Sequence, residues 1–160
     1  MIKVCMAAML ALPLLGAAPA AGAPAGFEHW SNSSIEQIDQ KLDATAATDP
    51  HRIGVQLFAD YPNDSEMLAH RKADGQAEWH ETQVDVIFVR SGSATLVVGG
   101  AMVSPETVAP HEKRSGTIEG GTREKLSAGD VVRIPARTPH QLLLDGSKEF
   151  EYFVVKVKGY

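Results

Sequence analysis

Residues 129–140, GDVVRIPARTPH, carry most of the information about the fold of this chain. A Gly-Asp turn precedes a short apolar strand pattern, and Pro135 and Pro139 then restrict the backbone on either side of a bend. A histidine after such a bend enters its strand in a fixed direction, which a coordination site requires. His140 is therefore either a metal ligand at the end of a strand or a polar residue where a strand meets solvent.

Short apolar segments separated by turn residues continue on both sides of this stretch. They are IGVQLFADY (53–61), EMLAHRKA (66–73), QVDVIFVR (83–90), ATLVVGG (94–100), HQLLLD (140–145) and EFEYFVVKV (149–157). Many short strands with closely spaced turns indicate an all-β sandwich or barrel. Ser91-Gly92-Ser93 predicts a tight hairpin. The polar, proline-interrupted residues 104–119 predict a long surface loop that leads into a short strand at 116–119.

The first 23 residues have the layout of a secretory signal peptide: a cation at Lys3, an apolar run over 4–15, then small residues. The run is too short for a membrane span, which needs about 20 residues. We expect cleavage of a leader over 1–20, or as late as Ala23, and a periplasmic or secreted protein. Cleavage also removes Cys5, the only cysteine, so the mature chain is expected to have no disulfide or thiolate chemistry.

Residues 21–50 predict a linker followed by an amphipathic helix, and residues 51–160 a single barrel domain. Ile35, Ile38 and Leu42 recur at helical spacing, Ser33 or Ser34 can cap the helix, and Asp49-Pro50 ends it. We expect the helix to pack across a sheet or against a partner subunit.

The charge balance excludes two classes of partner. Removal of Lys3 leaves 14 basic against 20 acidic residues, a net charge of −6. An acidic chain without basic clusters is a poor ligand for nucleic acid or anionic membranes. We therefore expect no nucleic-acid partner, and no membrane association after leader cleavage.

A second stretch, EWHETQVDVIFVRSG (78–92), supplies candidates for chemistry. Glu78 and His80, two apart in a strand, project from one face about 7 Å apart along the chain. A short bend after Glu81 lets Asp85, at the start of the next strand, point inward too. These side chains can converge on one ion together with His140.

Together the two stretches resemble the motifs of the cupins, small jelly-roll barrels that usually carry one metal ion. The first cupin motif is His-x-His, three or four residues, Glu, six residues, Gly. The second is Gly, five residues, Pro-x-Gly, two residues, His. The corresponding residues here are Glu78, His80, Asp85 and Gly92, then Gly129, Pro135, Arg137 and His140. The resemblance covers residues 57–157.

The resemblance implies a cupin-type jelly-roll β-barrel with an N-terminal amphipathic helix, and a metal site of His80, His140, Asp85 and Glu78. Glu78 replaces the first family histidine, Asp85 the family glutamate, and Arg137 the motif glycine. Two imidazoles with one carboxylate suit non-haem Fe(II), and the addition of Glu78 also suits Mn²⁺ or Zn²⁺. Asp85 is shorter than glutamate and can instead orient His80 from outside the coordination sphere.

Each candidate also has a purely structural interpretation. A histidine at a strand end commonly makes only a structural hydrogen bond. A carboxylate at a barrel mouth, such as Glu78, can simply be solvated. An aspartate at the start of a strand, such as Asp85, can accept a hydrogen bond from a nearby backbone N–H. Asp130 is expected to be a turn residue. The other histidines lack a comparable motif, and of these only His70 is placed to line the cavity; they are His29, His51, His70 and His111.

The sequence thus predicts an exported single-domain cupin that binds Fe, Mn or Zn and acts on, or binds, a small organic molecule. Oxygenase and isomerase chemistry are both compatible with such a centre. We expect an apolar cavity lined by Ile87, Val89, Leu142 and Leu144. A metal-free, non-catalytic small-ligand-binding cupin is the alternative, motivated by Glu78 in the place of a histidine. A third hypothesis is an assembly protein whose helix and long loop cover a neighbour's sheet edge. Jelly-roll proteins with an amphipathic N-terminal helix often form pairs, so a homodimer is also expected to be possible.

Overall fold

The computed structural model describes residues 22–160, so the signal peptide predicted over residues 1–20 lies outside the described residues. Residues 22–31 belong to a short separate unit, in which the Phe27 N–H donates to the Pro24 carbonyl at 3.1 Å. Residues 32–160 form the second unit, which holds one helix and twelve strands. Within residues 22–160, no helix is both long and apolar enough to span a membrane.

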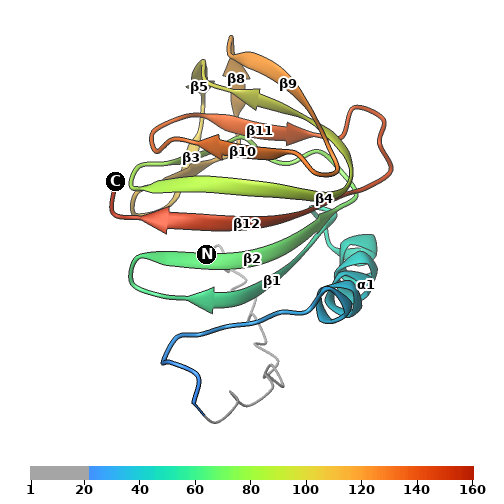
Figure 1. Ribbon diagram of the computed structural model, residues 1–160. Helices are drawn as coiled ribbons and strands as arrows, with labels where there is room; N and C mark the ends of the chain where they lie inside the picture. Colours follow the sequence, from blue (N-terminus) through green and yellow to red (C-terminus); the bar gives the residue numbers. More distant parts are fainter. Residues whose placement is uncertain (1–21) are drawn as a thin grey trace, which may run out of the picture. The chain divides into compact units, whose positions relative to one another are not determined.

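A curled antiparallel sheet makes up most of the second unit (Figure 1). The elements are α1 (Asn32–Thr48), β1 (Ile53–Asp60), β2 (Asp64–Arg71), β3 (Glu78–His80), β4 (Gln83–Val98), β5 (Ala101–Val103), β6 (Glu106–Ala109), β7 (Glu112–Arg114), β8 (Thr117–Glu119), β9 (Thr122–Ser127), β10 (Val131–Ile134), β11 (His140–Leu143) and β12 (Phe150–Lys158). The spatial order is β1-β2-β12-β4-β11-β3-β7-β6, with β9 and β10 also paired to β4 and a separate β5-β8 ribbon. The predicted all-β jelly-roll class is confirmed.

Strand β4 joins the two halves of this sheet. Its first half pairs with β12 and β10, and its second half, from Ser93 onward, pairs with β9 and β11. Between the halves, Arg90 is one extra residue relative to β12, and Gly92 has a φ of +74°. Such a bulge bends a strand without ending it. The hairpin predicted at Ser91-Gly92-Ser93 is therefore wrong, because Ser91 pairs with Glu151 and Ser93 pairs with a residue of β9.

The long loop predicted over residues 104–119 is also wrong in part. Besides the expected short strand, now β8, the segment contains β6 and β7. Pro105 and Pro110 both lie just outside β6, where no ladder hydrogen bond is required of them. All four residues of β6 are exposed and it is an edge strand, which explains why its composition is that of a loop.

Apolar side chains alternate along the inner strands and meet in one core. The largest fully buried side chains are those of Phe150, Leu68, Ile87, Ile134 and Val84. Each such side chain contributes roughly 1.5–3 kcal/mol relative to an exposed one. The core fixes the direction of β4, β11 and β12, the strands that also carry polar residues of the site.

The predicted helix is confirmed as α1, which lies beside β1 and β2 (Figure 1). Leu42 and Ala46, one turn apart, are buried. A Cβ added at Gly54 of β1 would overlap the Leu42 carbonyl, so the helix and strand backbones are in direct contact. The helix begins at Asn32, so Ser33 and Ser34 lie within its first turn and not at the capping position predicted for them.

Candidate metal centre

The four predicted site residues come from three strands that the fold brings together. Glu78 and His80 lie on β3, Asp85 near the start of β4, and His140 at the start of β11. Because β11 pairs with β3, His140 stands directly opposite Glu78 in the ladder. All four belong to the described residues, and three of them, His80, Asp85 and His140, are buried.

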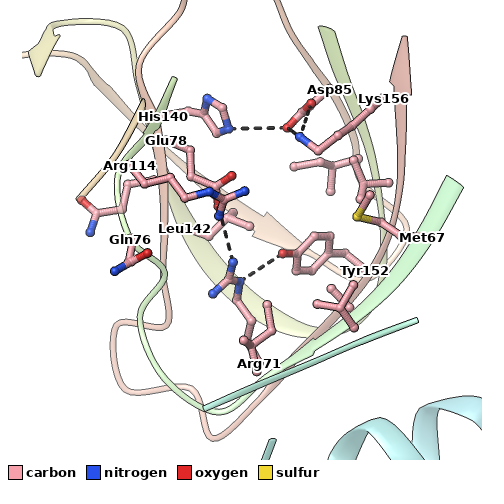
Figure 2. A pocket seen from close by; sticks show the side chains of 16 residues that line it. Met67, Arg71, Gln76, Glu78, Asp85, Arg114, His140, Leu142, Tyr152 and Lys156 are labelled. Carbon is pink, nitrogen blue, oxygen red and sulfur yellow. Dashed lines mark hydrogen bonds and ion pairs between the residues drawn. The ribbon is translucent and has the colours of Figure 1, made fainter. Parts of the chain in front are cut away.

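The two imidazoles face a common point. Their ring centroids are 5.3 Å apart. The Nε2 atoms of His80 and His140 each lie 3.5 Å from the same oxygen, Oδ2 of Asp85. Figure 2 shows His140 and Asp85 turned toward each other at one end of the pocket. Glu78 Oε2 lies 3.5 Å from His80 Nε2, and donor atoms of Glu78, His80 and His140 all fall within 4.8 Å of one another.

The protonation of His140 follows from its other nitrogen. Nδ1 lies 3.0 Å from the Thr138 carbonyl oxygen, which can only accept a hydrogen bond, so Nδ1 carries the proton. In the neutral ring Nε2 is then a lone pair, and it faces a carboxylate oxygen of Asp85. Two acceptors aimed at each other require a cation or a proton between them. This backbone contact to Nδ1 is the usual way in which a metal-binding imidazole is oriented.

A lysine from β12 supplies a cation at this point. Lys156 Nζ lies 2.7 and 2.8 Å from the two Asp85 oxygens and 3.0 Å from His80 Nε2. The donor set of His80, His140 and Glu78 fits a divalent metal in number and kind. A metal bound there would compete with the Lys156 ammonium for His80 and for Asp85.

The geometry distinguishes the two carboxylates. Glu78 belongs to the compact group with both imidazoles, whereas Asp85 contacts both Nε2 atoms and the ammonium of Lys156. Asp85 is not next to Nδ1 of either histidine, where a carboxylate that orients a ligating imidazole from outside would stand.

The charges around the carboxylates keep both of them ionised. Burial opposes ionisation of Glu78, but its contacts with His80 and the Arg114 guanidinium outweigh burial and lower its pKa to about 2. Burial likewise opposes ionisation of Asp85, but His140, His80 and Lys156 hold its pKa far below its usual range. Burial disfavours a charged His80, yet the contacts with Asp85 and Glu78 raise its pKa above the ordinary value. Both carboxylates are therefore available as anionic ligands, although cationic side chains already lie beside them.

The bend before His140 has an unusual backbone. Arg137 has a φ of +61°, a conformation that the motif glycine of cupins adopts without strain. Its N–H donates to the His80 carbonyl at 2.7 Å, so the bend is tied directly to β3. Asp130 is a turn residue as expected, and its carboxylate accepts from the Ser127 N–H at 2.8 Å.

A cavity of about 100 Å³ opens beside the centre. Ile87 and Leu142 line it as predicted, whereas Val89 and Leu144 pack in the core and are not part of its wall. His70 does not line it either, because Met67, Ala69 and Arg71 of β2 face the cavity and His70 lies on the opposite face of the strand. The placement of His70 in the cavity was therefore wrong.

Sequence reasoning missed six polar residues of the cavity wall: Arg71, Gln76, Arg114, Gln141, Tyr152 and Lys156. Arg71 Nε donates to the Tyr152 hydroxyl at 3.0 Å, and Arg114 Nη1 lies 3.3 Å from Glu78 Oε1 (Figure 2). Period-two alternation could have found Lys156 and Tyr152, which share a face of β12 with buried Phe150 and Val154. Arg71 shares a face with Ala69 in the same way. Nothing in the sequence around Arg114 indicated its position.

Glutamine at position 78 should flatten the acid-induced loss of stability. The folded-state pKa of Glu78, about 2, lies below the ordinary glutamate value of 4.5 because contacts with His80 and Arg114 outweigh burial. Its contribution is therefore fully present above pH 4.5 and is lost as the pH falls through about 2. A shift of this size is worth up to about 3 kcal/mol. We expect urea denaturation with a chelator to show a shallower fall in unfolding free energy from pH 5 to pH 2.5 in Glu78→Gln than in wild type. Glu124→Gln, at an exposed position on β9, is the control, and equal slopes in all three proteins would contradict the prediction.

Comparison with known proteins rests on structure alone, since no family model and no curated protein sequence matches the chain. The cupin domain of Schizosaccharomyces pombe Cnp3 is similar with a TM-score of 0.51 and 8% identity, over 67% of this chain and 65% of that one. A variant of Streptomyces PAC13, solved with uridine, has a TM-score of 0.50 and 10% identity, over 70% and 74%. A cupin 2 conserved barrel domain protein from Rhodopseudomonas palustris has a TM-score of 0.47 and 18% identity, over 66% and 60%. The match spans less than two thirds of the Cnp3 and R. palustris chains. At these identities the likeness concerns the fold, and the described chain is by that measure a cupin-fold protein.

Proposed function

We propose that this protein binds a divalent metal, Fe, Mn or Zn, through His80, His140 and Glu78, and uses it to bind or transform a small anionic molecule. One observation carries the proposal: two imidazole nitrogens and two carboxylates point at the same buried position. The leader predicted over residues 1–20 supports export, so we place this function in the periplasm or outside the cell.

The spacing of the acceptors supports a shared ion. Among the three proposed ligands, His80 Nε2 and Glu78 Oε2 lie 3.5 Å apart, longer than a good hydrogen bond, and both are within 4.8 Å of a His140 nitrogen. Ligands at roughly 2.0–2.1 Å from one tetrahedral ion lie about 3.3 Å apart. The side chains therefore need only small adjustments to share one ion.

The cavity wall supports an anionic ligand. Three cations, Arg71, Arg114 and Lys156, face two carboxylates, Glu78 and Asp85, so the wall has a net charge of +1 when His140 is neutral. A bound dication would raise this to +3. The cavity volume of about 100 Å³ lies below the range of pockets for drug-sized ligands, roughly 300–1,000 Å³. A molecule of a few carbon atoms with one carboxylate matches both the size and the charge.

Several side chains can act on such a ligand. A metal ion at this position would polarise an oxygen atom of the ligand, or supply the dioxygen chemistry of an oxygenase if the metal is iron. The Tyr152 hydroxyl accepts from Arg71, so its own proton is free to be donated to a ligand atom. Lys156 holds protons beside Asp85 and His80 and can serve as an acid toward the ligand, which suits isomerase chemistry equally well.

The metal-free alternative has one specific observation in its favour. The Lys156 ammonium already neutralises Asp85 and donates toward His80 Nε2. In that case the protein binds a small organic molecule without a metal, through the same arginines and Tyr152. The PAC13 structure, solved with uridine, is an example of this fold together with a small molecule.

Replacement of Lys156 by methionine separates the two functions. If the site binds metal, removal of the competing ammonium should raise the affinity for Zn²⁺ by at least about 10-fold, the change produced by about 1.4 kcal/mol. Zn²⁺ titration with a competing chelator measures this, on proteins that have no chelating tag and that all carry Asp43→Asn, which disrupts a separate group of acidic residues around His70. Lys158→Met is the control. Lys158 lies two residues after Lys156 and is paired with Asp60, outside the site, so this variant should bind Zn²⁺ like wild type. If neither wild type nor Lys156→Met binds Zn²⁺, Fe²⁺ or Mn²⁺, the metal proposal fails. A loss of stability in Lys156→Met that no metal restores would then support the alternative.

The ligand class can be tested with one matched pair of probes. Lactate and propane-1,2-diol have the same carbon skeleton and differ in the carboxylate. We expect lactate, and not the diol, to raise the melting temperature of the protein and to perturb NMR signals of Leu142 and Tyr152. Equal effects of both molecules, or of neither, would contradict the anionic-ligand proposal while leaving the metal site untouched.

A further inference from the structure

A second cluster of metal-binding side chains lies on the other face of β2, beneath α1. His70 of β2 is buried, with a side chain only 4% exposed. Asp39 and Asp43, one turn apart on α1, and Glu149, the residue before β12, surround its ring. None of these residues lines the barrel cavity, so the cluster is separate from the centre described above.

Only one of the two ring nitrogens of His70 has a hydrogen-bond partner among the described residues. Nδ1 lies 2.7 Å from Asp39 Oδ1. Nε2 is buried and, among the described residues, has no hydrogen-bond partner. It nevertheless faces two carboxylates, with Asp43 Oδ1 at 3.3 Å and Glu149 Oε2 at 3.8 Å. Leaving a buried nitrogen without a hydrogen bond destabilises the folded protein.

The arrangement is that of a carboxylate-oriented metal ligand. An ionised Asp39 can only accept, so Nδ1 carries the proton and Nε2 of the neutral ring is a lone pair. This lone pair points at carboxylates, so a metal cation or a proton is required between them. Carboxylate–histidine–metal triads have this order of groups. The distances of 3.3 and 3.8 Å are close to the separation of about 3.3 Å expected for two ligands of one tetrahedral Zn²⁺.

The local charge also favours a dication. Asp39, Asp43 and Glu149 contribute three negative charges, and Lys72, whose Nζ lies 2.6 Å from Asp43 Oδ1, contributes one positive charge. With His70 neutral, the cluster has a net charge of −2. The side chains of Asp43 and Glu149 are 43% and 49% exposed, so an ion can reach the position from solvent.

We propose that His70, Asp43 and Glu149 bind a Zn²⁺ ion that fastens helix α1 to the barrel. The three ligands come from the helix, from β2 and from the segment that enters β12. Strands β2 and β12 already pair with each other, so the ion would add a link between this pair of strands and the helix, whose buried residues are Leu42 and Ala46. Asp39 acts as the positioning residue that holds the ring of His70.

Zn²⁺ titration of variants that lack the barrel site tests the proposal. His140→Ala removes a barrel candidate and should still bind one equivalent of Zn²⁺, with a rise in melting temperature. Adding Asp43→Asn or Glu149→Gln should abolish this binding. Asp39→Asn should weaken it 10–100-fold, as loss of an orienting carboxylate does. Lys72→Met should strengthen it by at least about 10-fold, since it frees Asp43. Asp60→Asn, at an exposed strand end, is the matched control and should change nothing.

A direct readout accompanies the titration. The ¹⁵N shift of His70 Nε2 should move on addition of Zn²⁺ to His140→Ala, and His70→Gln should remove the signal and the binding together. The proposal is overturned if His140→Ala binds no Zn²⁺, or if binding persists unchanged in both Asp43→Asn and Glu149→Gln. If the ¹⁵N shift of His70 Nε2 responds to acid but not to Zn²⁺, the cluster is a protonated histidine paired with carboxylates, and the metal proposal is overturned. These outcomes do not depend on whether the barrel centre holds a metal.

Discussion

Replacing His140 with alanine is expected to lower the Zn²⁺ affinity of the barrel centre by at least about 100-fold. Loss of a group that only orients a metal ligand already costs 10–100-fold, and His140 is itself a candidate ligand. His80→Ala should have an effect of similar size, because both Nε2 atoms face the same Asp85 oxygen. Chelator competition in an Asp43→Asn background measures the barrel centre alone, because this substitution removes a ligand of the proposed site at His70.

Two comparisons make this result specific. His51→Ala, at an exposed histidine between α1 and β1, should leave the affinity unchanged. Substitutions of the two carboxylates should also differ in their effect on metal binding. Glu78→Ala is expected to lose metal more completely than Asp85→Ala, because Glu78 belongs to the compact donor group. The reverse order would show that Asp85 is the ligand and Glu78 only the partner of Arg71 and Arg114.

Alanine at position 92 should lower the free energy of unfolding by about 3 kcal/mol. The φ of +74° at Gly92 costs a residue with a side chain about 1–2 kcal/mol. An added Cβ would also overlap the Glu149 carbonyl of the neighbouring β12 segment, and overpacking typically adds 1–3 kcal/mol. Since domains are stable by only about 5–15 kcal/mol, this is a large share of the total. Urea denaturation monitored by tryptophan fluorescence measures it.

Gly99→Ala is the matched control for this substitution. Gly99 has a similar φ of +81°, but an added Cβ would meet no heavy atom within 4 Å. We expect it to cost only the backbone component, about 1–2 kcal/mol. The difference between the two variants then measures the contact between β4 and β12. Equal costs would mean that the bend at Gly92 relaxes freely and does not fix the junction of the two sheet halves.

The fold and three of the nine polar residues that line the cavity, Glu78, Asp85 and His140, could be predicted from the sequence. The motifs around His80 and His140 are local, and their resemblance to the two cupin motifs, together with strand spacing, predicted that Glu78, His80, Asp85 and His140 lie close together. Apolar segments bounded by turn residues likewise predicted strands such as β10 and β12. Both signals come from short stretches of the chain, the longest of which is residues 78–92.

The errors concern arrangements that depend on partners distant in sequence. Ser91-Gly92-Ser93 has the composition of a hairpin, and only the pairing of its two flanks with different strands makes it a bulge. Lys156 enters the centre because β12 pairs with β4, so that it stands opposite Asp85 in the ladder. The side chain of His70 points away from the cavity because helix α1 covers that face of β2, and the sequence of β2 does not indicate which face the helix covers. Short motifs do not encode such neighbours.

The position of β12 has a consequence for how the chain folds. Residues 150–158 come late in chain order, yet they form the strand between β2 and β4, and they carry Tyr152 and Lys156 into the cavity. The middle of the sheet can be completed only after residues 150–158 have been synthesised, long after β2 and β4. Pairing between segments so far apart is slow. The barrel therefore closes late in folding, and before that step β2 and β4 expose edges that β12 later covers.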